Sequence, residues 1–280
     1  MEDCILKIKV KFFDIDLLKS YCSLLTIVSL VFSFVFIFVE IPDKYKLVTG
    51  CVFLLLLLVL YIYLWLRVNL LTKMRLVINN STVNIKVGDI FEEVDLKVIA
   101  FNEYFDTQVD NRIISDKTIN GIFIKNVVSD CESLDNLINE NSHLKDMILE
   151  SNVAREKGKR NRYKLGTILE LDNYLITAFS KFDNDNRAYL NMNDYVNFLL
   201  NFWNEVDIVY CGRSISIPLF GSGITRIKEY NVITDQELLE LLVWSFKVSK
   251  IKFTYPSVIT IVIHDSKKEK INFYKLKGIL

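Results

Sequence analysis

The residues best suited to binding chemistry stand in a glycine-containing segment late in the chain. Nine glycines occur in 280 residues, and two of them fall within three positions of each other, in Ile217-Pro-Leu-Phe-Gly-Ser-Gly-Ile-Thr-Arg226. Because glycine has no side chain, backbone N–H groups in such a loop can converge on an anion such as a diphosphate. The candidate binding residues here are Gly221, Ser222, Gly223 and Ile224. A plain tight turn is the alternative, and the simpler one for this loop taken alone.

Two carboxylate or amide side chains upstream have the chemistry to recognise a nucleoside. Val87-Gly88-Asp89-Ile90 is followed about ten residues later by Val98-Ile-Ala-Phe-Asn-Glu-Tyr-Phe-Asp106. An aspartate such as Asp89 can accept from an adenine amino group, and an asparagine after a strand, here Asn102, can hydrogen-bond ribose hydroxyls. Taken singly, each is more simply a turn residue or a helix cap.

A dense basic cluster, Lys157-Gly-Lys-Arg-Asn-Arg162, offers partners for anions. Arginine forms bidentate hydrogen bonds with phosphate and carboxylate groups. A solvated loop is the alternative interpretation. The candidate arginines are Arg160, Arg162, Arg187 and Arg226. Asp183 and Asp185 have the chemistry to contact a ribose or an amine, although Asn- and Asp-rich segments are ordinarily turns.

The composition disfavours nucleic acid as a partner, and it disfavours disulfides and a zinc site. The 34 basic residues balance 34 acidic ones, so no overall field favours nucleic acid. The five cysteines are scattered and odd in number, which disfavours a disulfide framework. With only His143 and His264 as histidines, a zinc site is also disfavoured.

Two apolar stretches precede these candidates. Residues 20–39 and 47–66 hold no charged residue, and each is long enough to cross roughly 30 Å of hydrocarbon as a helix. A polar link containing Pro42 separates them. We therefore predict a two-helix transmembrane hairpin over 20–66, in preference to a buried soluble hairpin or a cleaved signal peptide. Neither span carries Asp, Glu, Lys or Arg, which disfavours a transporter's ion path. Two helices from one chain cannot line a pore, so any function beyond anchoring requires assembly with other copies.

Lysine and arginine counts near the spans predict the orientation. Lys7, Lys9, Lys11 and Lys19 precede the first span, Arg67, Lys73 and Arg75 follow the second, and the link carries Lys44 and Lys46. Both termini of this multi-pass protein are therefore expected on the cytoplasmic side of a bacterial inner (cell) membrane. Residues 1–19 are expected to lie along the headgroups or to form a disordered tail. Residues 67–75 are expected to be a linker.

The remaining residues, 76–280, alternate strand-like and helix-like segments. Helical patterns cover 133–150 and 194–205, and Thr234-Asp-Gln-Glu237 is a capping box ahead of a helix over 238–248. Such alternation predicts an α/β domain whose mixed or parallel sheet is covered on both faces and binds ligands beyond the carboxyl ends of its strands. Strand-like runs occupy 97–101, 119–125, 167–171, 174–179, 206–211 and 258–264.

Taken in order, these pieces resemble the macro domain, a module that binds ADP-ribose. In that family a Gly-Asp-Ile turn supplies the adenine-binding aspartate, here Asp89 beside Ile90, and a strand ends in an asparagine facing the distal ribose, here Asn102. A late strand leads to the loop around the diphosphate, here residues 221–224. The resemblance covers most of residues 76–280 and implies a macro-like three-layer α/β/α domain with a mixed central sheet.

A narrower resemblance is to the membrane effector of type II Thoeris antiphage systems, a macro-like domain behind two transmembrane helices. The phrases similar to that group's are Asn102-Glu-Tyr-Phe-Asp-Thr107, Lys157-Gly-Lys-Arg-Asn-Arg-Tyr163, Asn186-Arg-Ala-Tyr189 and Ile217-Pro-Leu-Phe-Gly-Ser-Gly223. In that family a partner TIR-domain enzyme converts NAD into an ADP-ribose-derived messenger, a histidine conjugate. The resemblance implies that this chain binds the messenger, assembles and disrupts the membrane, so that the infected cell dies or is arrested.

Departures from the family pattern bear on catalysis. Macro domains that hydrolyse ADP-ribose esters usually place a glycine run soon after the asparagine, whereas residues 106–115 contain no glycine. The second asparagine of the usual pair is also absent. The missing glycine run favours binding over hydrolysis, and the missing asparagine bears on the contact with the distal ribose. Asp106 is among the ligand candidates. The rival functions are a membrane-tethered ADP-ribosyl hydrolase, for which Asp106 or Asp110 is the base candidate, and an anchored scaffold without a ligand.

Overall fold

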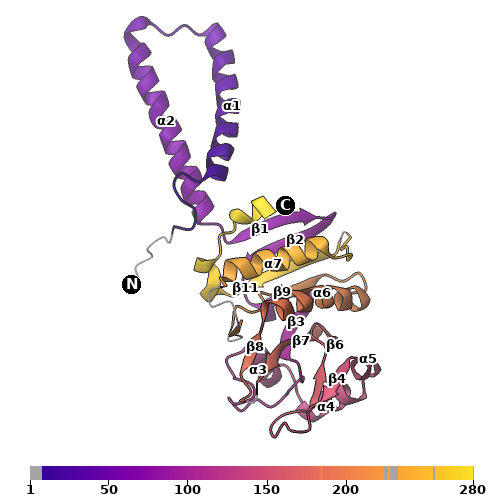
Figure 1. Cartoon of the computed structure of the whole chain (residues 1–280). Helices are drawn as coiled ribbons and strands as arrows, with labels where there is room; N and C mark the ends of the chain where they lie inside the picture. Colours follow the sequence, from indigo (N-terminus) through magenta and orange to yellow (C-terminus); the bar gives the residue numbers. More distant parts are fainter. Residues whose placement is uncertain (1–7, 184, 224–225, 228–232, 255, 280) are drawn as a thin grey trace. The chain divides into compact units, whose positions relative to one another are not determined.

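The computed structural model describes residues 8–183, 185–223, 226–227, 233–254 and 256–279 (Figure 1). The chain divides into two compact units. The first comprises Met1–Thr72 together with Asn272–Lys275, and the second comprises Lys73–Ile271 together with Leu276–Leu280.

The first unit contains two long apolar helices. Helix α1 (Ile15–Phe38) and helix α2 (Asp43–Asn69) are both long and apolar enough to cross a membrane. Asp14 caps α1, because its Oδ1 accepts from the backbone N–H groups of Asp16 at 3.0 Å and Leu17 at 3.1 Å. Helix α1 covers the predicted span 20–39 up to Phe38, and α2 contains the predicted span 47–66.

The predicted linker over 67–75 is shorter in the structure. Helix α2 continues to Asn69, and strand β1 begins at Lys73 because it pairs with the following strand. Residues 9–14, expected on the headgroups or in a disordered tail, contribute Val10 and Phe12 to a hydrophobic cluster within the first unit. Val10 and Leu17 are buried there with Tyr61 and Tyr274.

The second unit is built on a mixed sheet. Nine strands among the described residues form it, in the order β1-β2-β11-β9-β3-β7-β8-β10, with β6 pairing β7. Strands β2, β11, β9, β3 and β7 run parallel, whereas β1 and β6 are antiparallel to their neighbours. The bounds are β1 Lys73–Ile78, β2 Ser81–Val87, β3 Leu96–Asn102, β6 Ile168–Leu171, β7 Tyr174–Phe182, β8 Ala188–Leu190, β9 Ile215–Pro218, β10 Arg226–Ile227 and β11 Val258–Ile263; β4 Ile148–Ser151 and β5 Asn161–Tyr163 form a separate pair.

Helices cover both faces of this sheet. The side chains of Ile99, Phe101 and Ile176 enter one core with residues of α3 (Ile119–Asn126), α4 (Cys131–Glu140) and α5 (Ser142–Asp146). From the opposite face of β7, Phe179 packs against Phe198 of α6 (Met192–Val209), and α6 contacts α7 (Asp235–Val248) (Figure 1). The predicted three-layer α/β/α fold with a mixed sheet is confirmed. Short 3-10 helices are η1 Ile90–Glu92, η2 Asp265–Lys270 and η3 Lys275–Ile279.

Several predictions of local structure are confirmed, and two predicted strands are wrong. The capping box ahead of α7 is present, since Thr234 Oγ1 accepts from Glu237 N and Glu237 Oε2 accepts from Thr234 N. Residues 119–125 form α3, and residues 206–209 are the end of α6, not strands. Both segments are short apolar runs, and hydrophobic periodicity alone cannot tell a short buried strand from a buried helix. Tertiary packing stabilises both as helices. The predicted helix over 133–150 is α4, α5 and the start of β4.

One glycine contact generates a prediction on stability. Gly166 has a φ of +93°, and a Cβ there would lie 2.7 Å from both Asn201 Cβ and Phe202 N. Left-handed backbone and overpacking together predict that Gly166→Ala lowers the free energy of unfolding by about 3 kcal/mol. Gly212→Ala is the matched control, since its φ is +74° but nothing lies within 4 Å of the added carbon. It should cost only about 1 kcal/mol. Equal losses in denaturant unfolding of the detergent-solubilised chain would contradict the packing argument.

Candidate ligand-binding site

A cavity of about 430 Å³ opens where the parallel strands end. Its wall includes residues at or just beyond the carboxyl ends of β2, β11, β9, β3 and β7, as the parallel arrangement predicts. Six residues proposed from the sequence line it, namely Asp89, Ile90, Asn102, Gly221, Ser222 and Gly223. The strand order therefore brings together segments that lie up to 134 positions apart in the chain.

The glycine loop follows β9, not the segment ending at Cys211. Gly221 has a φ of +82°, which favours glycine, and Ser222 Oγ donates to Leu219 O at 2.9 Å. Tyr195 of α6 donates from its hydroxyl to Phe220 O at 3.2 Å. Burial raises the pKa of Tyr195, so the hydroxyl keeps the proton that holds this loop. A Cβ on Gly223 would meet nothing within 4 Å.

Two predicted residues of this segment are only partly or not at all described. Ile224 lies outside the described residues. Arg226 belongs to β10, where its backbone pairs with that of Tyr189 in β8.

The Gly-Asp-Ile turn follows β2. Asp89 is exposed, and its Oδ1 accepts from Phe91 N at 2.9 Å, which starts η1. Gly88 N donates to Ile263 O at 3.0 Å and so ties the turn to the end of β11. Ile90 is buried beneath the turn. The carboxylate is thus presented at one end of the cavity on a backbone that β11 supports.

Asn102 and Asp106 form one hydrogen-bonded turn at the end of β3. Asn102 Oδ1 accepts from the N–H groups of Tyr104 at 3.0 Å and Asp106 at 3.3 Å, and its Nδ2 donates to Asp106 Oδ2 at 3.0 Å. Asn102 is buried, with part of its surface on the cavity. Asp106 is 1% exposed and lies outside the described cavity lining.

Arg155 neutralises the buried Asp106. Its Nη1 donates to Oδ1 at 3.1 Å and its Nη2 to Oδ2 at 2.7 Å, and the backbone N–H of Lys159 adds a third donor at 2.7 Å. Gly158 makes this close approach possible, because a Cβ there would lie 2.6 Å from Asp106 Oδ1 and its φ is +89°. The segment 155–159 therefore wraps a buried carboxylate.

Two arginines of the basic cluster also lie outside the described lining. Arg160 is exposed. Arg162 pairs with Glu103 through its Nε at 3.1 Å and with Glu150 through its Nη1 at 2.5 Å. Burial raises the pKa of Glu103, and Arg162 and the Phe182 N–H oppose that rise. The exposure of Arg160 fits the solvated loop given as the alternative, whereas Arg162 is held in ion pairs within the domain.

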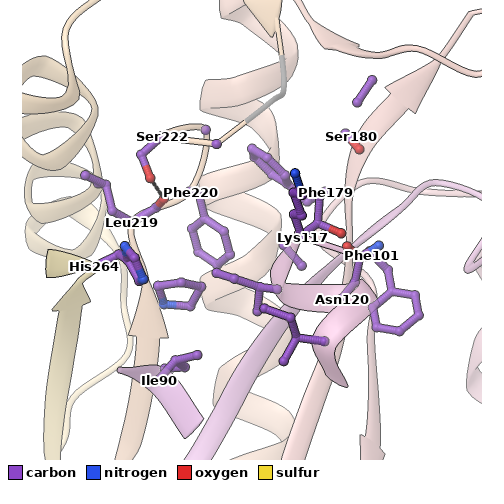
Figure 2. Close-up of a pocket in the computed structure, with 18 of the residues that line it drawn as sticks. Ile90, Phe101, Lys117, Asn120, Phe179, Ser180, Leu219, Phe220, Ser222 and His264 are labelled. Atoms are coloured by element: carbon purple, nitrogen blue, oxygen red, sulfur yellow. Dashed lines mark hydrogen bonds between the residues drawn. The ribbon is translucent and has the colours of Figure 1, made fainter. Parts of the chain in front are cut away.

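The facing wall of the cavity is formed by residues that were not predicted from the sequence. Figure 2 shows Leu219, Ser222 and His264 on one side and Lys117, Asn120 and Ser180 on the other. Residues 117–120 were missed because the following segment was assigned to a strand. The available signal was Thr118, whose hydroxyl accepts from Gly121 N at 3.2 Å and caps α3. Ser266 and Lys267 of η2 complete the missed polar lining.

A second cavity of about 660 Å³ lies beside the first, and Phe182 lines both. The predicted residues Asp183, Asp185 and Arg187 line it, and Asp183 Oδ1 accepts from the N–H groups of Asp185 and Arg187 as in an ordinary aspartate turn. The remaining basic residues in this wall are Arg112, Arg155 and Lys157.

The aspartates proposed as catalytic bases are engaged elsewhere. Asp110 accepts from the N–H groups of Arg112 and Ile113, both at 2.8 Å. The Ile113 N–H is the main cause that lowers the pKa of Asp110, and neither Asp106 nor Asp110 is in the described lining of the first cavity. Within the described residues no three or more His, Cys, Asp or Glu side chains group as metal ligands.

The chain is similar to known proteins in sequence and in fold. The family model for the macro domain of Thoeris protein ThsA matches residues 83–264. A Thoeris protein ThsA of Bacillus amyloliquefaciens (strain Y2) is 45% identical over 217 residues, or 76% of this chain and 72% of that protein. Among solved structures, the Oceanobacillus iheyensis macrodomain with ADP has a TM-score of 0.44 at 15% identity, covering 74% of this chain and 96% of the other. The same macrodomain with MES bound has a TM-score of 0.45 at 16% identity, covering 74% and 96%.

A mixed sheet between two helical layers, with a cavity at the carboxyl ends of its parallel strands, is the architecture of a macro domain. The chain belongs to the Thoeris ThsA family, because the family model spans most of the second unit and the 45% identity extends over three quarters of the chain.

The Asp106–Arg155 pair yields a prediction on stability. Asp106→Asn leaves the Arg155 guanidinium, whose side chain is 7% exposed, without its counter-charge. Losing one partner of a buried pair costs about 3 kcal/mol, or about 6–12 °C in a domain of this size. Asp185→Asn is the control, since the Asp185–Arg187 pair is 67% and 64% exposed. It should shift thermal unfolding in detergent by less than about 2 °C, and a similar shift in both variants would contradict the argument.

Proposed function

We propose that this chain is the membrane effector of an antiphage Thoeris system. Its macro domain binds an ADP-ribose-derived signalling nucleotide, the histidine conjugate of ADP-ribose, which a partner TIR-domain enzyme makes from NAD. Binding drives assembly of the effector with copies of itself in the bacterial inner membrane. The assembled hairpins then disrupt the bilayer, so that the infected cell dies or is arrested.

The observation that carries the proposal is the single cavity that unites an exposed aspartate, a buried asparagine and a glycine loop. Asp89, Asn102 and Gly221–Gly223 line it together in a chain that matches the ThsA macro domain family. In the proposed pose, Asp89 accepts from the adenine amino group and the loop surrounds the diphosphate. Aromatic side chains, Phe101, Phe179 and Phe220 among them, supply the apolar wall that a nucleoside needs.

The second cavity is the proposed place for the group that distinguishes the messenger from plain ADP-ribose. Because Phe182 lines both cavities, a ligand that fills the first can extend past this ring into the second. Arg187 lines the second cavity and is suited to a carboxylate such as that of an amino acid. Arg160 and Arg162 remain second-rank candidates that lie outside the described lining of both cavities. Arg226 also remains a second-rank candidate.

The membrane role rests on the hairpin. Helices α1 and α2 are long and apolar enough to span the bilayer, and two spans leave both termini on the cytoplasmic side that the lysine and arginine counts favour. A ligand shifts assembly only if it binds the assembled form more tightly than the free form. Two helices from one copy cannot line a pore, so disruption requires several copies.

The rival function is an ADP-ribosyl hydrolase. It requires a base that reaches the ligand, and the two base candidates are held by Arg155 in one case and by backbone N–H groups in the other. This engagement favours a binding module. Release of ADP-ribose from ADP-ribosylated substrates by the purified chain would favour the hydrolase instead.

Substitution in the glycine loop tests the binding site. Gly223→Glu places a carboxylate where the diphosphate is proposed to lie, so ADP-ribose binding by the full chain in nanodiscs should fall at least about 100-fold by calorimetry. Gly278→Glu makes the same change in equally open space outside the cavity and should bind like the wild type. Wild-type protein that binds neither ADP-ribose nor its histidine conjugate would rule the proposal out.

A second substitution tests which messenger is preferred. Arg187→Gln should weaken binding of the histidine conjugate about tenfold and leave ADP-ribose binding unchanged, because only the conjugate carries the carboxylate. Arg160→Gln is the matched control, since Arg160 is exposed and outside both described cavity walls. An equal loss for both ligands would assign Arg187 to the ADP-ribose moiety or to folding.

A further inference from the structure

The cytoplasmic end of the hairpin is held by a buried asparagine. Asn69, the last residue of α2, is 3% exposed and accepts through Oδ1 from Lys9 N at 2.7 Å and Val10 N at 2.9 Å. Its Nδ2 donates to Trp65 O at 2.8 Å, and Trp65 Nε1 donates to Val10 O at 2.9 Å. Trp65 and Asn69 are one helical turn apart, so one face of α2 binds the N-terminal segment through its backbone.

We call this packed end of the hairpin, formed by residues 9–10, Trp65 and Asn69, the hairpin base. The chain's C-terminal region adds a third segment to it. We call Asn272–Lys275 the strap; it belongs to the first unit. Asn272 Nδ2 donates to Lys9 O at 3.2 Å. The Tyr274 hydroxyl donates to Asp16 O at 3.0 Å and lies 2.8 Å from Ser20 Oγ. Tyr274 is 7% exposed, within the cluster of Val10, Leu17 and Tyr61. The strap therefore contacts both the N-terminal segment and the first two turns of α1.

The strap is short and is fixed on both sides to the second unit. Ile271 before it and Leu276 after it are both fully buried and belong to that unit. Directly upstream, η2 places Ser266 and Lys267 in the wall of the first cavity. Lys267 and Asn272 are five positions apart, which the chain spans with at most about 18 Å. This short length of chain is the route by which a displacement of η2 can reach the strap.

We propose that the strap is the mechanical connection between the ligand cavity and the membrane hairpin: it holds the hairpin base closed, and ligand binding at η2 loosens it. This inference rests on the proposed function, because it requires a ligand in the first cavity. It adds the residues through which binding acts on the membrane helices, namely Asn272 and Tyr274.

The ion pairs between η2 and α7 are the contacts that a bound ligand would change. Lys267 Nζ and Lys270 Nζ lie 3.6 Å and 3.7 Å from Asp235 Oδ2, at the start of α7. A diphosphate at the glycine loop brings two negative charges to the same cavity wall that Lys267 lines. It competes with Asp235 for the lysine, since opposite charges in a partly buried site attract strongly. The position of η2 then depends on whether Lys267 pairs with Asp235 or with the ligand.

The test begins without ligand. Tyr274→Phe removes the hydroxyl but keeps the ring, and Asn272→Ala removes the contact with Lys9. In the full chain reconstituted into dye-loaded phosphatidylglycerol–phosphatidylcholine vesicles, each should raise leakage and amide hydrogen exchange at Val10 by about tenfold, the scale of a lost hydrogen bond. Tyr45→Phe is the matched control, because Tyr45 is half exposed at the opposite end of α2. Variants that leak and exchange like the wild type would overturn the proposal.

Ligand then tests the coupling, with ADP-ribose as the probe. In wild-type protein ADP-ribose should accelerate exchange at Val10 and Tyr274, and Tyr274→Phe should bind it about tenfold more tightly, because coupling is reciprocal. Calorimetric binding without any change in exchange would overturn the strap while leaving the binding function intact. If ADP-ribose does not bind, the histidine conjugate is the probe, and absence of calorimetric binding of both ligands would overturn the binding function and the coupling with it.

Discussion

The ion pair between Asp106 and Arg155 decides the shape of the carboxyl end of β3. An almost fully buried carboxylate is tolerated only because a guanidinium and a backbone N–H satisfy its oxygens. The same carboxylate accepts from Asn102, whose amide oxygen in turn closes the backbone turn. The cavity wall at β3, the loop around Gly158 and the second cavity lined by Arg155 all depend on this one charge.

Part of the basic cluster 157–162 takes part in the same set of buried contacts. Arg155 and Lys159 are directed inward at Asp106 and its neighbours, and Arg162 neutralises Glu103, a carboxyl whose pKa burial raises. These cations therefore stabilise the loops around the site through contacts within the domain. Arg187, by contrast, lies in the wall of the second cavity and pairs with Asp185 in an exposed ion pair. Because exposed ion pairs are weak, a ligand's carboxylate can replace Asp185 in the proposed function.

The hairpin and the macro domain are joined in the chain at two places, not one. The first connection is short, since α2 ends at Asn69 and β1 begins at Lys73. The second is the strap, which leaves and re-enters the second unit between two buried residues. In the proposed function, these two connections are the route by which a small change at η2 alters the packing of the first unit.

Sequence by itself determined the elements whose signals are local. Uncharged stretches of membrane length predict α1 and α2, and the capping box predicts the start of α7. The Gly-Asp-Ile turn and the glycine loop are recognised from the few residues that form them. Only the tertiary structure decided which charges face a ligand and which face each other, because ion pairs such as Asp106 with Arg155 join residues 49 positions apart. It also decided that 119–126 is a helix on the cavity, and that the chain's C-terminal region packs with the hairpin base. Periodicity and residue type do not report contacts between distant segments, and those contacts set burial, pairing and orientation.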